Sequence, residues 1–247
     1  MINKLGLVLE CAREGADEKV MTCLTRRLAP TTVLARPACM ASKELLMNNG
    51  AEAAQQLLSA EHCDRVFIVW DLKPAWEEEE QHLTHTEEIS LMGGKLAALG
   101  IQGDVDLFCI VHMLETWVIA DDRAVSAHLS RPTRAFNFRR VLHPESHPDP
   151  KALLISNFAA SRRGTYRDHT DAVRIIQKSP DTTRLRRTST FSSLLQKLTG
   201  SSTTDFLHCG GACNDLARSG NFQPIQAPRP INPPAIVAVA RRGRPRR

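Results

Sequence analysis

The sequence predicts an α/β fold in which a mainly parallel β-sheet is flanked by helices. Four short runs rich in Val, Ile and Leu are separated by segments whose apolar residues recur at helical spacing. Near-continuous apolar runs are typical of strands covered on both faces, and strands that alternate with helices favour parallel crossovers. The 247 residues suffice for one large domain or two small ones.

The expected strands and helices alternate through the first half of the chain. The strands are the runs LGLVLEC (5–11), TTVLARP (31–37), RVFIVWD (65–71) and VDLFCIVHM (105–113). Three helical stripes lie between them, made by Val20, Leu24 and Leu28, by Leu45, Leu46, Ala53, Ala54, Leu57 and Leu58, and by Ile89, Met92, Leu96 and Leu99.

After the fourth strand the pattern becomes helical. Residues 114–129 place several apolar side chains on one broad face, and further helices are expected over 150–160, 169–177 and 189–198. Little periodicity remains beyond residue 200. We therefore expect an α/β domain at 1–128, a helical region at 129–200 and a disordered basic tail at 201–247.

Charge and cysteine usage bear on partners and location. Seven arginines and only two aspartates follow Gly200 and account for the whole formal excess of +5. The tail thus resembles a nucleic-acid-binding arm. The sequence has seven cysteines, an odd number, and most lie within apolar runs. This placement favours reduced thiols and therefore a cytoplasmic protein. No apolar run reaches the length of a membrane span or signal peptide, so no membrane partner is expected.

Acidic residues follow three of the four predicted strands. Glu10 and Glu14 follow the first strand, Asp71 ends the third, and Glu115 follows the fourth. Because ligands of open parallel sheets bind at the carboxyl ends of the strands, these carboxylates are candidate ligands of Mg²⁺ or Mn²⁺. The alternative is that each acid only begins a helix, where carboxylates cap free amides.

Five short motifs carry a family resemblance over residues 5–198. In order they are ECAREGADEKVMTCL, VFIVWDLKPAW, HMLETWVIADDRAV, DPKALL and RLRRTSTFSSLLQKL. They resemble the motifs of a bacterial family of unknown function with a Toprim-like, Rossmann-like fold, whose relatives often accompany phage-defence systems. The resemblance implies a Toprim-like domain and a partner protein of such a system.

Toprim domains of primases, topoisomerases and nucleases place a glutamate after the first strand and an Asp-x-Asp pair after the third. By motif, Glu14 resembles the Toprim glutamate, an acid or base that can also bind the metal; by position at the strand end, Glu10 is the alternative, and Glu14 is preferred. Asp71 matches the first aspartate, but Lys73 replaces the second. Glu115, in a motif similar to the family's Leu-Glu-Ala-Trp, is the candidate replacement metal ligand, and Lys73 is a candidate phosphate contact.

These residues lead to two functional hypotheses. The first is Mg²⁺-dependent, nuclease-like phosphodiester chemistry on nucleic acid. The second is a non-catalytic binding or sensor component that partners a separate effector, which Lys73 favours because the acidic pair is incomplete. Basic clusters in the helical region are further candidate phosphate contacts, although solvated helix faces often carry such charges; they comprise Arg162, Arg163, Arg167, Arg184, Arg186 and Arg187.

Overall fold

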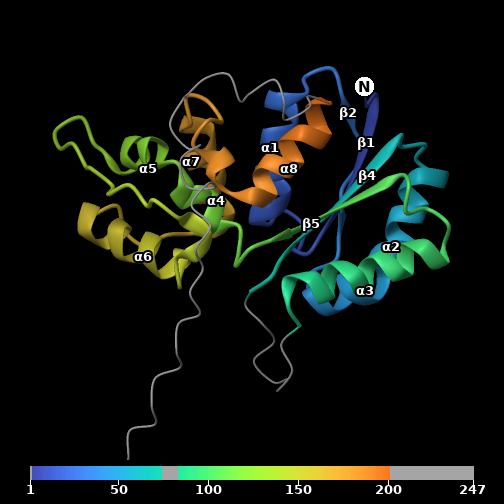
Figure 1. Cartoon of the computed structure of the whole chain (residues 1–247). Helices are drawn as coiled ribbons and strands as arrows, with labels where there is room; N and C mark the ends of the chain where they lie inside the picture. Colours follow the sequence, from blue (N-terminus) through green and yellow to red (C-terminus); the bar gives the residue numbers. More distant parts are fainter. Residues whose placement is uncertain (1, 74–82, 201–247) are drawn as a thin grey trace, which may run out of the picture. The chain divides into compact units, whose positions relative to one another are not determined.

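The computed structural model of the chain describes residues 2–73 and 83–200. The predicted basic tail at 201–247 lies outside these described residues. The described part belongs to one compact unit, and its elements follow one another from strand β1 to helix α8 (Figure 1).

The centre of the structure is a parallel β-sheet, as the sequence predicts. Its main strands are β1 (Lys4–Leu9), β4 (Arg65–Asp71) and β5 (Val105–Ile110). The strand order is β2-β1-β4-β5, and both β2 (Val33–Leu34) and β3 (Ala38–Cys39) pair with β1. Every pairing is parallel, so β1, β4 and β5 end at the same edge of the sheet.

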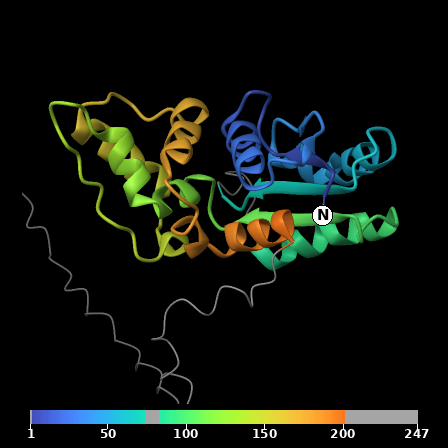
Figure 2. The same cartoon turned by 90° about the horizontal axis from the view of Figure 1, so that it is seen from above.

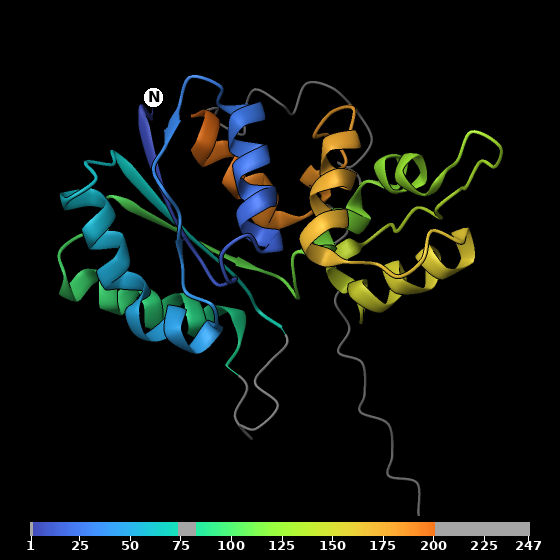
Figure 3. The same cartoon turned by 180° about the vertical axis from the view of Figure 1, so that it is seen from behind.

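Two hydrophobic clusters cover the two faces of the sheet. Leu5, Leu7 and Leu9 of β1 join one cluster, whereas Val8 joins the other, as the two-residue period of a strand requires. Helices α2 (Lys43–Ser59) and α3 (His85–Ala98) pack on the second face. Helices α1 (Ala16–Leu28) and α8 (Ser189–Thr199) lie on the first face, as Figures 1 and 3 show.

The remaining helices gather beyond one end of the sheet (Figure 2). They are α4 (Glu115–Ala120), α5 (Asp122–Leu129), α6 (Pro150–Ser161) and α7 (Val173–Lys178), with short 3₁₀ turns at Pro144–Ser146 and Leu185–Arg187. Their apolar residues belong to the same cluster as β1 and α1. The boundary expected between residues 128 and 129 therefore falls within α5 and within one continuous core.

Three details differ from the sequence-based expectation. The strand expected over 31–37 is replaced by the two short strands β2 and β3, on either side of Pro37, which has no N–H to donate to a ladder. The helix expected over 169–177 begins with a π-helical turn at Asp168–Ala172 before α7. Leu45, assigned to an apolar stripe, is 45% exposed.

Within the described ranges, no helix is both long and apolar enough to cross a membrane.

Candidate functional site

A pocket of about 590 Å³ opens at the carboxyl ends of β1, β4 and β5. Its wall combines the loops that follow these strands with the start of α1 and with α6 from the helical part. The residues that line it are Glu10, Cys11, Gly15, Ala16, Asp17, Ala41, Ser42, Asp71, Met113, Leu114, Glu115, Asp149, Lys151, Ala152, Ile155, Asp168 and His169. We call this cavity the acidic pocket, because acids from three strand ends meet there.

Glu10 links the ends of β1 and β4. Its Oε2 accepts a hydrogen bond from the backbone N–H of Asp71 at 2.9 Å. Burial raises the pKa of the Glu10 carboxyl, although that hydrogen bond and the positive charge of Lys43 oppose the shift. Glu10 is thus held in place by the neighbouring strand.

Asp71 ends β4 and carries a strongly perturbed carboxyl group. Burial raises its pKa well above the ordinary value, and the negative charges of Asp17, Glu10 and Glu115 raise it further. Its Oδ1 is buried without a hydrogen-bond partner in the described part of the chain. A buried carboxylate oxygen without a donor is costly unless it is protonated or meets a cation.

Asp17 is a fourth acid of the pocket, and the sequence reasoning did not select it. It lies in the first turn of α1, where acidic residues are common because they face the positive end of the helix dipole. Burial and then the charges of Glu10 and Glu115 raise the pKa of Asp17 to about 7. Nothing in the sequence distinguished it from an ordinary first-turn acid.

Glu115 begins α4, directly beyond β5, and is 5% exposed. Its Oε1 accepts a hydrogen bond from the Tyr166 hydroxyl at 3.3 Å. Burial raises the pKa of Glu115, while the charge of Lys151 lowers it. Lys151 in turn donates to Asp168 Oδ2 at 2.8 Å. The helical part therefore supplies a cation and a further carboxylate to the site, neither of which strand-end reasoning finds.

A buried polar network supports the pocket from the α2–α3 side of the sheet. Lys43 Nζ donates to the Leu72 carbonyl at 2.9 Å and lies 2.5 Å from Glu88 Oε1. Glu88 Oε2 accepts a hydrogen bond from Trp70 Nε1 at 2.7 Å. Both Lys43 and Glu88 are buried, so this pair fixes the chain on both sides of Asp71.

Two of the predicted site residues lie outside the acidic pocket. Glu14 is exposed, has a left-handed backbone with φ of 60°, and lines a separate groove beside α1. Lys73 is exposed, and its backbone N–H donates to the His112 carbonyl at 2.6 Å. Of the sequence-based candidates, the fold therefore brings together Glu10, Asp71 and Glu115.

Backbone conformation is unusual in the loops around the pocket. Five non-glycine residues have positive φ in the described ranges, and three of them lie in the loops after β1, β3 and β5. These three are Glu14, Ala41 and His112, with φ of 60°, 69° and 69°. Such conformations cost free energy and cluster at functional sites.

The donor atoms of the acidic pocket suit a hard divalent cation, which prefers carboxylate oxygens. The unpartnered Oδ1 of Asp71 and the mutual repulsion of the acids fit such an ion. In the described residues, however, no three His, Cys, Asp or Glu side chains are arranged as a ready-made metal site. Binding would therefore require the side chains of Glu10, Asp71 and Glu115 to move toward one another.

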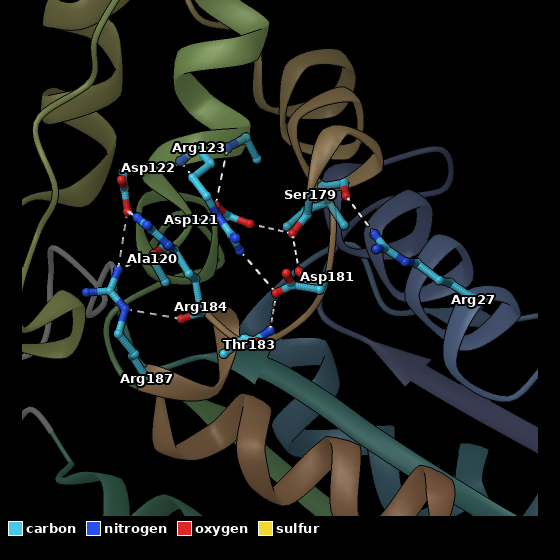
Figure 4. Close-up of polar contacts among 12 residues, drawn as sticks. Arg27, Ala120, Asp121, Asp122, Arg123, Ser179, Asp181, Thr183, Arg184 and Arg187 are labelled. Atoms are coloured by element: carbon cyan, nitrogen blue, oxygen red, sulfur yellow. Dashed lines mark hydrogen bonds and ion pairs between the residues drawn. The ribbon is translucent and has the colours of Figure 1, made fainter. Parts of the chain in front are cut away.

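Two arginines of the RLRR motif, Arg184 and Arg187, serve a structural network, shown in Figure 4. Arg184 pairs with Asp122, and Arg187 donates to the carbonyl of Ala120. Asp121 caps α5 by accepting from the N–H groups of Arg123 and Ala124, and it also accepts from the Ser179 hydroxyl at 2.5 Å. Arg184 and Arg187 are therefore used to join α4 and α5 to the segment before α8.

Comparison with known proteins found no matching family model, no matching curated protein and no matching solved structure.

Proposed function

We propose that the acidic pocket performs divalent-cation-dependent, nuclease-like phosphodiester chemistry on nucleic acid. The observation that carries the proposal is the meeting of Glu10, Asp17, Asp71 and Glu115 at the carboxyl ends of parallel strands, where open α/β sheets bind their ligands. The Toprim-like resemblance supports the same chemistry and extends the proposal to phage defence with a partner protein.

In this proposal Asp71 and Glu115 hold Mg²⁺ or Mn²⁺ together with Glu10. When bound, the cation would neutralise phosphate oxygens and make a coordinated water more acidic. Hydrolysis forms one P–O bond from water, breaks one P–O ester bond, and moves a proton from the water to the leaving oxygen. Asp17 lines the same pocket and is not assigned to the cation, so it is the candidate for this proton transfer.

A first prediction tests the cation. Millimolar Mg²⁺ or Mn²⁺ should raise the Tm of the wild type, because binding to the folded state alone stabilises it by mass action. Asp71→Asn should raise the Tm in EDTA, because a neutral amide avoids the cost that burial and the neighbouring acids impose on an ionisable carboxyl group, and it should reduce the metal-dependent increase.

The matched control is Glu52→Gln, which removes an exposed carboxylate of α2 and should preserve the full metal-dependent increase. A wild-type Tm that is indifferent to both metals would rule out the cation site.

The activity itself is tested with labelled single-stranded and duplex DNA and RNA. Cleavage should require Mg²⁺ or Mn²⁺, stop in EDTA, and fall by at least about 100-fold in Asp17→Asn, in the range typical of a lost general acid or base. Glu52→Gln should cleave like the wild type.

A second candidate function is a non-catalytic binding or sensor component. It is favoured by Lys73, which stands where Toprim nucleases have a second aspartate, and by the lack of a ready-made three-ligand group in the described residues. Under this alternative a metal-dependent change in Tm would persist without any cleavage. The same two assays therefore separate the two candidates.

A further inference from the structure

A second cavity, of about 660 Å³, runs between α1 and α7. We call it the basic groove, because Lys19, Arg26 and Arg27 line it together with the polar side chains of Thr22 and Gln177. Helices α1 and α7 lie side by side along it (Figure 3). No step of the proposed chemistry uses these residues.

The basic side chains form one stripe on α1. Lys19, Thr22, Arg26 and Arg27 are spaced at i, i+3, i+7 and i+8, which places them on the same face of a helix. At 1.5 Å per residue, the stripe from Lys19 to Arg26 is about 10 Å long. Successive phosphates of one DNA strand advance by about 3.4 Å along the helix axis, so a stripe of this length can contact more than one phosphate.

The basic side chains of this stripe form no salt bridge with a carboxylate of the described residues. Lys19 Nζ donates to the carbonyl of His169 at 3.0 Å, and Arg27 donates to the carbonyl of Ile176 at 3.5 Å. Arg26 is exposed and forms no side-chain hydrogen bond or salt bridge within the described ranges, although its charge acts on the Cys23 thiol. These cations therefore remain available to an anionic ligand.

The basic groove adjoins the acidic pocket. Lys19 lines the groove, and the carbonyl that it binds belongs to His169, which lines the pocket. A strand in the groove would thus reach the pocket directly. Glu14 and Glu18 also line the groove, and both precede the basic stripe in sequence, so the attraction is strongest at Arg26 and Arg27.

A polyanionic substrate would need positive charge near the acidic pocket in order to bind there. The acidic pocket gathers Glu10, Asp17, Asp71 and Glu115; those that are ionised repel an approaching polyanion, and in a nucleic-acid enzyme this repulsion must be offset nearby. We infer that the basic groove binds the phosphate backbone of a nucleic-acid strand and leads it to the acidic pocket. The inference rests on the proposed function for the substrate class and adds where that substrate binds.

Fluorescence anisotropy with labelled oligonucleotides in EDTA tests the groove without cleavage. Arg26→Ala/Arg27→Ala should weaken binding at least tenfold and reduce the slope of log K against log salt by about two, one for each lost phosphate contact. Arg26→Ala alone should show about half of the slope change; because Arg26 forms no side-chain hydrogen bond or salt bridge in the described ranges, this variant should fold like the wild type.

The control is Arg139→Ala/Arg140→Ala, which removes the same charge from exposed positions before the Pro144–Ser146 turn. It should bind nearly like the wild type. An equal loss in this control would show a general charge effect and overturn the inference. So would a wild type that binds no oligonucleotide, or a groove that binds poly-glutamate and not nucleic acid.

Two outcomes separate this inference from the proposed function. If Asp71→Asn binds oligonucleotides like the wild type but does not cleave them, both the proposed chemistry and the inferred role of the groove are supported. If the wild type never cleaves but its binding depends on Arg26 and Arg27, the proposed chemistry is wrong, whereas the inference that the basic groove binds nucleic acid is supported.

Discussion

At the scale of single residues, the carboxyl groups of the acidic pocket are perturbed first by burial and then by one another. The raised pKa values of Glu10, Asp17, Asp71 and Glu115 share burial as their first cause, and a negative neighbour adds to each shift. The pKa shift of each acid means that the folded chain binds protons more tightly than the unfolded chain. Protons and divalent cations therefore compete for the same oxygens.

A prediction for Asp17 follows from the sign of its shift. Its pKa is about 7 in the folded protein against an ordinary value of 3.8. The associated stability is fully present below about pH 4 and is lost as the pH rises through about 7. In EDTA, Asp17→Asn should therefore become progressively more stable than the wild type between pH 4 and pH 7.

Urea unfolding at several pH values measures this difference, with Glu52→Gln as the control that shows no such trend. A constant difference between Asp17→Asn and the wild type across this range would mean that Asp17 titrates normally.

The sequence could reveal part of this site. Glu10, Asp71 and Glu115 were found because the ends of parallel strands meet at one edge. Glu14 was preferred on its motif, but the loop after β1 turns it outward to the basic groove. Lys151 and Asp168 come from the helical part, and a single sequence does not show which of its loops folds back onto the sheet.

At the scale of elements, the long apolar runs predicted three strands well. Residues 65–71 match β4 fully, since a short, continuously apolar run is typical of a strand that is covered on both faces. The run at 31–37 failed because Pro37 interrupts the hydrogen-bond ladder beside β1. The helices at 150–160 and 189–198 were placed within a residue of α6 and α8.

The loop between β1 and α1 gives a prediction at this scale. A Cβ on Gly15 would lie 2.7 Å from the Ala12 carbonyl oxygen and 2.8 Å from Cys11 Cβ. Gly15→Ala must therefore displace the loop that joins Glu10 to Asp17. We expect a loss of about 1–3 kcal/mol in the free energy of unfolding, together with a smaller metal-dependent increase in Tm.

Gly93→Ala is the matched control, because a Cβ at Gly93 in α3 meets nothing within 4 Å. It should stabilise the protein by about 0.5–1 kcal/mol, since alanine favours a helix interior. If the two alanine variants behaved alike in urea unfolding, the close packing of Gly15 would be refuted.

At the scale of the whole described structure, the sheet and the helical part share one core. Helix α8 returns to the sheet, where Phe191 packs edge-to-face on Trp117 of α4 with ring centroids 5.4 Å apart. Both side chains are buried in the cluster that contains Leu7 of β1 and Val20 of α1. Local sequence patterns indicated where the helices lie, but not that the last of them covers the first face of the sheet.

Cooperative unfolding is the prediction that follows. Because the core is continuous, the sheet and the helical part should unfold in one transition, followed alike by far-UV circular dichroism and tryptophan fluorescence.

Phe191→Ala should remove about 3–5 kcal/mol from the free energy of unfolding. Hydrogen exchange should show that the amides of β1 and β4 lose protection along with those of α7. Leu142→Ala, at a position that is 67% exposed, should change stability by less than about 0.5 kcal/mol. Two separate transitions, with the strands of the sheet unaffected by Phe191→Ala, would instead mean that the helical region is a domain of its own, and the acidic pocket would then depend on how that domain docks.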